Sequence, residues 1–119
     1  MLNVGIENIG HMVVCSCTGN IVQSEDASKL RAAVTSQTNA RIIVLDLTEV
    51  HAIEGDGLDM LCALQRCALD RNIQFKLFDP SSSVRSRLEH NESTQFDIAR
   101  FEEMITLLAQ SESRIPQAA

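Results

Sequence analysis

A short acidic segment, Glu54-Gly55-Asp56-Gly57, carries the side chains of this chain that are best placed for chemistry. Two carboxylates this close could act as general bases, but that work also needs a positioned nucleophile, partner base or metal. His51 lies three positions before Glu54, so a metal site of His51, Glu54 and Asp56 is one interpretation. Three ligands in six residues without a second cluster are weak evidence, and we expect no metal and no cofactor.

Helix capping is a structural interpretation of the same residues. Asp56 is expected to be the N-cap of a helix over residues 57–69, and Asp59 follows it three residues later. That spacing resembles a capping box with Asp in place of Glu. Capping a helix and binding another protein are compatible, so the two uses do not exclude each other.

The helix predicted over residues 57–69 has two apolar stripes. We assign one stripe to the core, and its members are Leu58, Leu61, Cys62, Gln65, Ala68 and Leu69. The second stripe is formed by Met60, Leu64 and Cys67, nearly opposite the first. Because apolar patches beside polar rims mark interaction sites, we interpret it as a partner-docking surface. The alternative is that neighbouring loops or the final helix cover it.

Other candidate groups carry less information. Ser81, Ser82 and Ser83 could accept phosphate at a helix N-terminus, although such serines more often serve as turn and cap residues. The four cysteines have C-x-C and C-x4-C spacings, which do not match a zinc site. No P-loop, dinucleotide fingerprint or nucleophile elbow is present. We therefore predict no catalytic residues.

Composition narrows the class of protein further. The chain has 119 residues, enough for one domain. Its formal net charge of −6 and its lack of Trp and Tyr argue against nucleic-acid binding. No apolar run approaches the roughly 20 residues of a membrane span, and no secretory signal is visible. We expect a cytoplasmic protein whose cysteines are reduced.

Strands and helices are expected to alternate along the chain. Residues 41–47, RIIVLDL, are almost continuously apolar, as is typical of a central strand in a parallel sheet. Further strands are expected at 3–9, at 11–16 or 17, at 74–78 and at 96–98, and further helices from Ser24 as N-cap to about Asn39, from Ser82 or Ser83 to His90, and from Arg100 or Phe101. This order predicts parallel β-α units with right-handed crossovers, and a loose tail at 113–119 after a domain of residues 1–112.

The stretch Arg41 to Leu58 resembles the signature of the STAS domain, the fold of the bacterial anti-sigma-factor antagonists. The residues that match are Asp46, Thr48, Val50, Ile53, Gly57 and Leu58, with Glu54 where the family has Asp. Two further stretches resemble the family, Thr18-Gly19-Asn20-Ile21 and the strand and helix from Phe75 to Leu88. The resemblance implies an α/β fold, a STAS-like single domain with a mixed four- or five-stranded sheet and helices packed chiefly on one face.

The resemblance also implies a function and shows one departure. In the family's antagonists, a partner kinase phosphorylates the Ser that follows the Asp, and here that position is Gly55, so no phosphorylation is expected there. We expect a non-enzymatic module that binds an anti-sigma factor or a regulatory kinase through Glu54, Gly55, Asp56 and Gly57. The alternatives are a regulatory subunit of an ATP-driven transporter, and, less favoured, an enzyme with Glu54 or Asp56 as general base. A homodimer is also open.

Overall fold

The computed structural model describes residues 2–37, 40–90 and 96–113, and for residues 110–113 it describes the backbone only. Its elements are β1 (Asn3–Ile9), β2 (Met12–Ile21), α1 (Ser24–Thr35), β3 (Ile42–Ile53), α2 (Asp56–Asp70), β4 (Gln74–Phe78), α3 (Ser82–Glu89), β5 (Ile98–Ala99) and α4 (Phe101–Ser113). Every expected strand and helix is therefore present. The predicted end of the first helix near Asn39 and most of the predicted tail, residues 114–119, lie outside the described residues.

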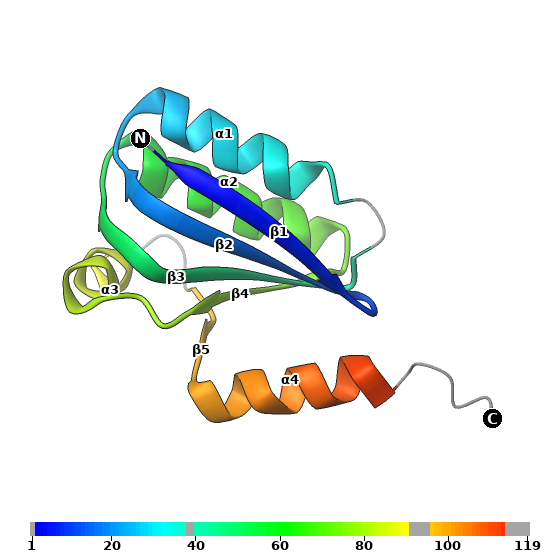
Figure 1. The fold of residues 1–119 in the computed structure, drawn as a ribbon. Coiled ribbons are helices and arrows are strands. Elements are labelled where there is room, and N and C mark those ends of the chain that lie inside the picture. Colours follow the sequence, from blue (N-terminus) through cyan, green and yellow to red (C-terminus); the bar gives the residue numbers. More distant parts are fainter. Residues whose placement is uncertain (1, 38–39, 91–95, 114–119) are drawn as a thin grey trace.

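The five strands form one mixed sheet in the order β1-β2-β3-β4-β5 (Figure 1). β1 is antiparallel to β2, and all other neighbouring strands are parallel. β3 is longer than predicted, since it continues past Leu47 to Ile53. Val50 and Ile53 in this extension are buried, so the added length contributes to the core and sets where the next loop begins.

The two faces of the sheet are covered differently (Figure 1). α1 and α2 lie on one face, where they bury the larger hydrophobic cluster with Leu45, Leu47 and Leu77 of the sheet. α4 covers the other face, where Met104 and Leu107 pack with Met12 and Val44. The expectation of helices chiefly on one face is confirmed, with α4 as the helix on the opposite face.

A buried lysine helps to attach α4. Lys76 of β4 is 7% exposed, and its Nζ lies 2.7 Å from Asp97 Oδ2 and 2.7 Å from Glu103 Oε2. Burial alone would lower the pKa of Lys76, but its hydrogen bonds to Asp97 and Glu103 raise the pKa above its ordinary value. The charged lysine therefore links β4 both to the residues before β5 and to the first turn of α4.

Both predicted N-caps are wrong by one residue. The N-cap of α1 is Gln23 rather than Ser24, because the Asp26 carboxylate accepts a hydrogen bond from the Gln23 backbone N–H at 3.2 Å. The N-cap of α2 is Gly55 rather than Asp56. Asp56 is instead the first helical residue, so the predicted capping box of Asp56 and Asp59 does not form.

Candidate partner-binding site

Residues 54–57, which join β3 to α2 and include the first two residues of α2, form a tight turn at the carboxyl end of the central strand; we call this segment the acidic loop. The Gly57 N–H donates to the Glu54 carbonyl at 3.0 Å. Between them, Gly55 has φ 53° and ψ −121°, the geometry of the first central residue of a type II′ turn. L-residues rarely adopt this conformation, so the shape of the acidic loop depends on glycine at position 55.

The acidic loop is pressed against the end of β2. The Glu54 N–H donates to the Ile21 carbonyl at 3.1 Å. Gly57 is buried, and a Cβ atom built on it would lie 2.2 Å from the Ile21 carbonyl oxygen. Only a residue without a side chain fits this approach, so the close packing of the loop on β2 depends on glycine at position 57.

The charged side chains of this region face solvent. Glu54 is exposed and forms an ion pair with Arg87 of α3, which is also exposed. Asp56 and Asp59 are exposed in the first turn of α2. Negative charge near a helix N-terminus is favourable, since the backbone N–H groups there carry partial positive charge. The site therefore presents carboxylates from a rigid turn, one of them already paired.

α3 borders the acidic loop, and the role of one of the three serines is to cap this helix. The Ser81 hydroxyl accepts a hydrogen bond from the Val84 N–H at 3.4 Å, so Ser81 is the N-cap of α3. Ser83 donates to the His51 carbonyl at 3.4 Å, which joins α3 to the end of β3. The interpretation of these serines as turn and cap residues holds for Ser81.

Thr48 carries a hydroxyl group on β3, six positions before Glu54. Its Oγ1 donates to Asp46 Oδ1 at 2.6 Å and lies 3.5 Å from Asp79 Oδ2. Thr48 is exposed, but two carboxylates surround its hydroxyl group. Any added negative charge at Thr48 would be opposed by both of them.

The residues of the metal hypothesis do not form a site. Within the described part of the chain, no three His, Cys, Asp or Glu side chains gather as metal ligands, and His51, Glu54 and Asp56 are no exception. The general-base hypothesis meets a different obstacle at Glu54, because the Arg87 guanidinium already contacts its carboxylate.

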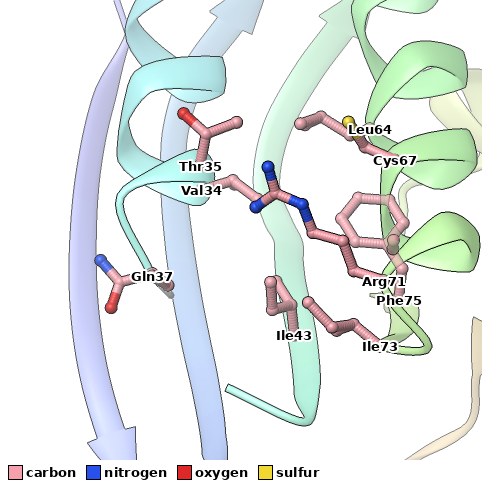
Figure 2. Close-up of a pocket in the computed structure, with 10 residues that line it drawn as sticks. Val34, Thr35, Gln37, Ile43, Leu64, Cys67, Arg71, Ile73 and Phe75 are labelled. Carbon is pink, nitrogen blue, oxygen red and sulfur yellow. The ribbon is translucent and has the colours of Figure 1, made fainter. Parts of the chain in front are cut away.

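The predicted docking stripe on α2 is wrong. Met60 is 7% exposed and Leu64 is 4% exposed, so both belong to the core, and Cys67 alone of the three is exposed. Figure 2 shows the cause, since Leu64 and Cys67 of α2 face Val34 of α1 across a shared pocket. That pocket measures about 30 Å³, which is room for one or two water molecules.

The opposite stripe of α2 is only partly core. Leu61 and Ala68 are buried as predicted, whereas Leu69 at the end of the helix is 70% exposed. α2 packs against the sheet on one side and against its neighbour α1 on another, so two of its sides are covered. The two apolar stripes of α2 therefore reflect its two contacts within the protein, one with the sheet and one with α1.

Arg87 is the residue of this site that the sequence did not predict. Nothing in the local sequence links Arg87 to Glu54, because the two residues are 33 positions apart. The order and direction of the strands are the signal from which this contact could have been predicted. β4 runs parallel to β3, so the helix after β4 begins at the same edge of the sheet as the acidic loop.

The cysteines belong to the fold rather than to this site. All four are free thiols, and Cys15 and Cys17 are buried in the larger cluster. Burial raises the pKa of Cys15 to about 11 and that of Cys17 to about 12. Both thiols therefore stay protonated near neutral pH, and the two side chains act as small apolar residues of the core.

Comparison with known proteins identifies the family and the fold. The sequence profile described as "STAS domain" matches residues 4–113. The structure resembles the unphosphorylated anti-sigma factor antagonist SpoIIAA, with TM-score 0.73 and 16% identity over 91% of this chain and 97% of that one. It also resembles an anti-sigma factor antagonist from Mycobacterium paratuberculosis, with TM-score 0.73 and 18% identity over 92% and 95% of the two chains.

A third similar structure comes from a much longer protein. It is the murine Slc26a9 anion transporter, with TM-score 0.69 and 12% identity over 87% of this chain and 18% of the transporter chain. Within the described residues, no helix of the present protein has the length and apolar character needed to cross a membrane. No curated protein sequence matches this chain.

Proposed function

This chain belongs to the STAS domain family, and we propose that it is a non-catalytic regulatory module that binds an anti-sigma factor or a related regulatory kinase. The proposed binding surface is the acidic loop with the exposed first turn of α2. The proposal includes a cytoplasmic location, since a protein that binds such a partner would act there.

The observation that carries this proposal is the fixed, solvent-facing geometry of the acidic loop. Loops at the carboxyl ends of strands are the usual contact sites of open α/β sheets. This one is held by the Ile21 carbonyl, by the close packing of Gly57 and by the Glu54–Arg87 pair, yet its Asp56 carboxylate stays exposed. A rigid surface loses little conformational entropy when a partner binds. Two of the most similar folds are anti-sigma factor antagonists, which supports this class of partner.

We further propose that no phosphoryl group regulates the acidic loop. Gly55 has no hydroxyl, and its backbone conformation disfavours the serine that would supply one. Thr48 is the hydroxyl residue that precedes the loop on β3, and a phosphate there would place about −1.5 to −2 charges beside Asp46 and Asp79. Residues 54–57 themselves contain no hydroxyl group for a kinase to phosphorylate.

Without a serine at position 55 that a kinase could phosphorylate, two opposite outcomes are open. The protein binds its partner constitutively, or a carboxylate that mimics phosphate prevents partner binding permanently. We propose constitutive binding. Asp56 does not cap α2, but its carboxylate carries one charge at most and lies at the positive end of the helix. Arg87 already compensates the neighbouring Glu54.

The double variant Gly55→Ser with Asp56→Ser separates these two outcomes. Under constitutive binding, the variant in the absence of ATP should bind the partner no more tightly than the natural protein does. Binding at least tenfold tighter, about 1.4 kcal/mol, would show that Asp56 acts as a phosphate mimic. A melting curve of the variant is needed beside the affinity, because serine at position 55 strains the turn.

The test of the proposed surface uses two matched charge reversals on α2. Asp56 is the first residue of the helix and Asp70 is the last, and both are exposed. Immobilised natural protein should capture an anti-sigma factor or regulatory kinase from the native cell, identified by mass spectrometry. Asp56→Arg should reduce that capture at least tenfold, whereas Asp70→Arg should leave it within twofold.

Three results would contradict the proposal. Capture of a transporter ATPase would favour the transporter-subunit alternative instead. Equal losses from the Asp56 and Asp70 variants would mean that general charge, not the loop, attracts the partner. Retained capture by Asp56→Arg would move the binding surface elsewhere.

A further inference from the structure

β1 is an open edge of the sheet. Its seven residues all pair with β2 on one side, from Asn3 opposite Thr18 to Ile9 opposite Met12, without a register shift. Among the described residues, no strand pairs with its other side. Alternate N–H and C=O groups of β1 therefore point away from the sheet and can accept another strand.

The usual protections of an edge strand are scarce in β1. Natural edges carry lysine, proline, bulges or very short strands, which block pairing with other chains. β1 has neither lysine nor proline, and Glu7 is its only charged residue. Ile6 at its centre is 41% exposed although it is a large apolar side chain. At the opposite edge of the sheet, β5 has only two residues, so β1 is the long edge available for pairing.

We propose that β1 pairs with β1 of a second copy of this chain, antiparallel and centred on Ile6. In that register Ile6 faces Ile6, Gly5 faces Glu7, and Val4 faces Asn8. The only charged residue of the strand therefore meets the residue without a side chain, and no two like charges face each other. The exposed isoleucine meets its own copy, which is a favourable cross-strand pair.

The symmetry of this register favours a second copy over an unrelated strand. A pairing about a twofold axis is isologous and closes on itself, so it yields a dimer and not a fibre. The two sheets would join into one sheet with both long edges paired. The β1 edge contains no residue of the acidic loop, so dimer formation and partner binding are separate properties that separate variants can test.

Light scattering after size exclusion tests the dimer with a matched pair of variants. The natural protein should have twice the 13.1 kDa mass of one chain. Ile6→Lys places two ammonium groups opposite each other at the axis and should give the monomer mass. Leu69→Lys makes the same change at an apolar residue that is 70% exposed on α2, and it should leave the dimer intact. Circular dichroism confirms that both variants fold.

Engineered thiols test the register itself, in a Cys67→Ser background that removes the exposed native cysteine. Ile6→Cys should form an intermolecular disulfide under mild oxidation, because position 6 faces itself across the axis. Asn8→Cys should not, because the two copies of position 8 lie four residues apart along the strands, beyond disulfide reach. A monomer at all concentrations, a dimer that survives Ile6→Lys, or equal crosslinking at positions 6 and 8 would each overturn the proposal.

Discussion

The first turn of α2 and the body of the same helix have opposite surroundings. Asp56 and Asp59 in the first turn face solvent, whereas Leu61 and Leu64 one and two turns later are 0% and 4% exposed. The body is covered by the sheet on one side and by α1 on another. One helix thus supplies a charged surface at its end and much of the core along its length. Substitutions in the two parts should have different effects, on binding for the end and on stability for the body.

The largest effect is expected from Leu64→Glu in the body of α2. The substitution removes an apolar side chain from the core and leaves a carboxylate there without a partner, which costs several kcal/mol. We expect the melting temperature to collapse or the protein to fail to fold. Ala63→Glu is the control, because Ala63 is the adjacent exposed residue and should change stability by about 0.5 kcal/mol or less. A Leu64→Glu variant that melts like the natural protein would restore the docking stripe.

A smaller loss is expected from Gly57→Ala, where the acidic loop meets β2. The added methyl group would lie 2.2 Å from the Ile21 carbonyl oxygen, which neither backbone can avoid without moving. Overpacking of this kind costs about 1–3 kcal/mol, measured by denaturant unfolding. Gly5→Ala is the matched control, because a Cβ at Gly5 has no atom within 4 Å of the same chain; both variants are measured in the Ile6→Lys background, which removes the proposed β1 pairing. Similar stabilities of the two variants would mean that the loop is not pressed on β2.

A still smaller loss, of about 1–2 kcal/mol, is expected from Gly55→Ala. The Cβ has free space at this position, so the whole cost comes from the backbone φ of 53°. D-Alanine, introduced by chemical ligation, prefers positive φ and should leave the free energy of unfolding unchanged or slightly higher. If the L and D variants are equally stable, the turn at position 55 does not have the geometry described.

The elements were predictable from local pattern, but the surroundings of α2 were not. The apolar run at residues 42–47 marked the central strand, and alternation of strands and helices marked the α/β class. Helical periodicity showed that α2 has two apolar stripes, yet it cannot say how many neighbours cover a helix. Leu64 became core because α1 packs beside α2, a contact between segments distant in sequence.

Details of the acidic loop were also beyond the sequence for physical reasons. Asp56 is a good capping residue, but the positive φ at Gly55 places the cap one residue earlier, and no periodic pattern records a single dihedral angle. The Glu54–Arg87 pair depends on how α3 lies against β3, which follows from strand order rather than from either residue. The prediction that Glu54 to Gly57 bind a partner depends on neither detail and stays a prediction.

The most direct test of the proposed function is partner affinity measured before and after treatment with ATP and the captured kinase. We predict that mass spectrometry finds no phosphate on residues 51–57 and that the Kd changes by less than twofold. The Gly55→Ser, Asp56→Ser variant serves as the control that regains hydroxyl groups in the loop. Phosphate within the loop of the natural protein, or an affinity at least tenfold weaker after treatment, would contradict binding that is independent of phosphorylation.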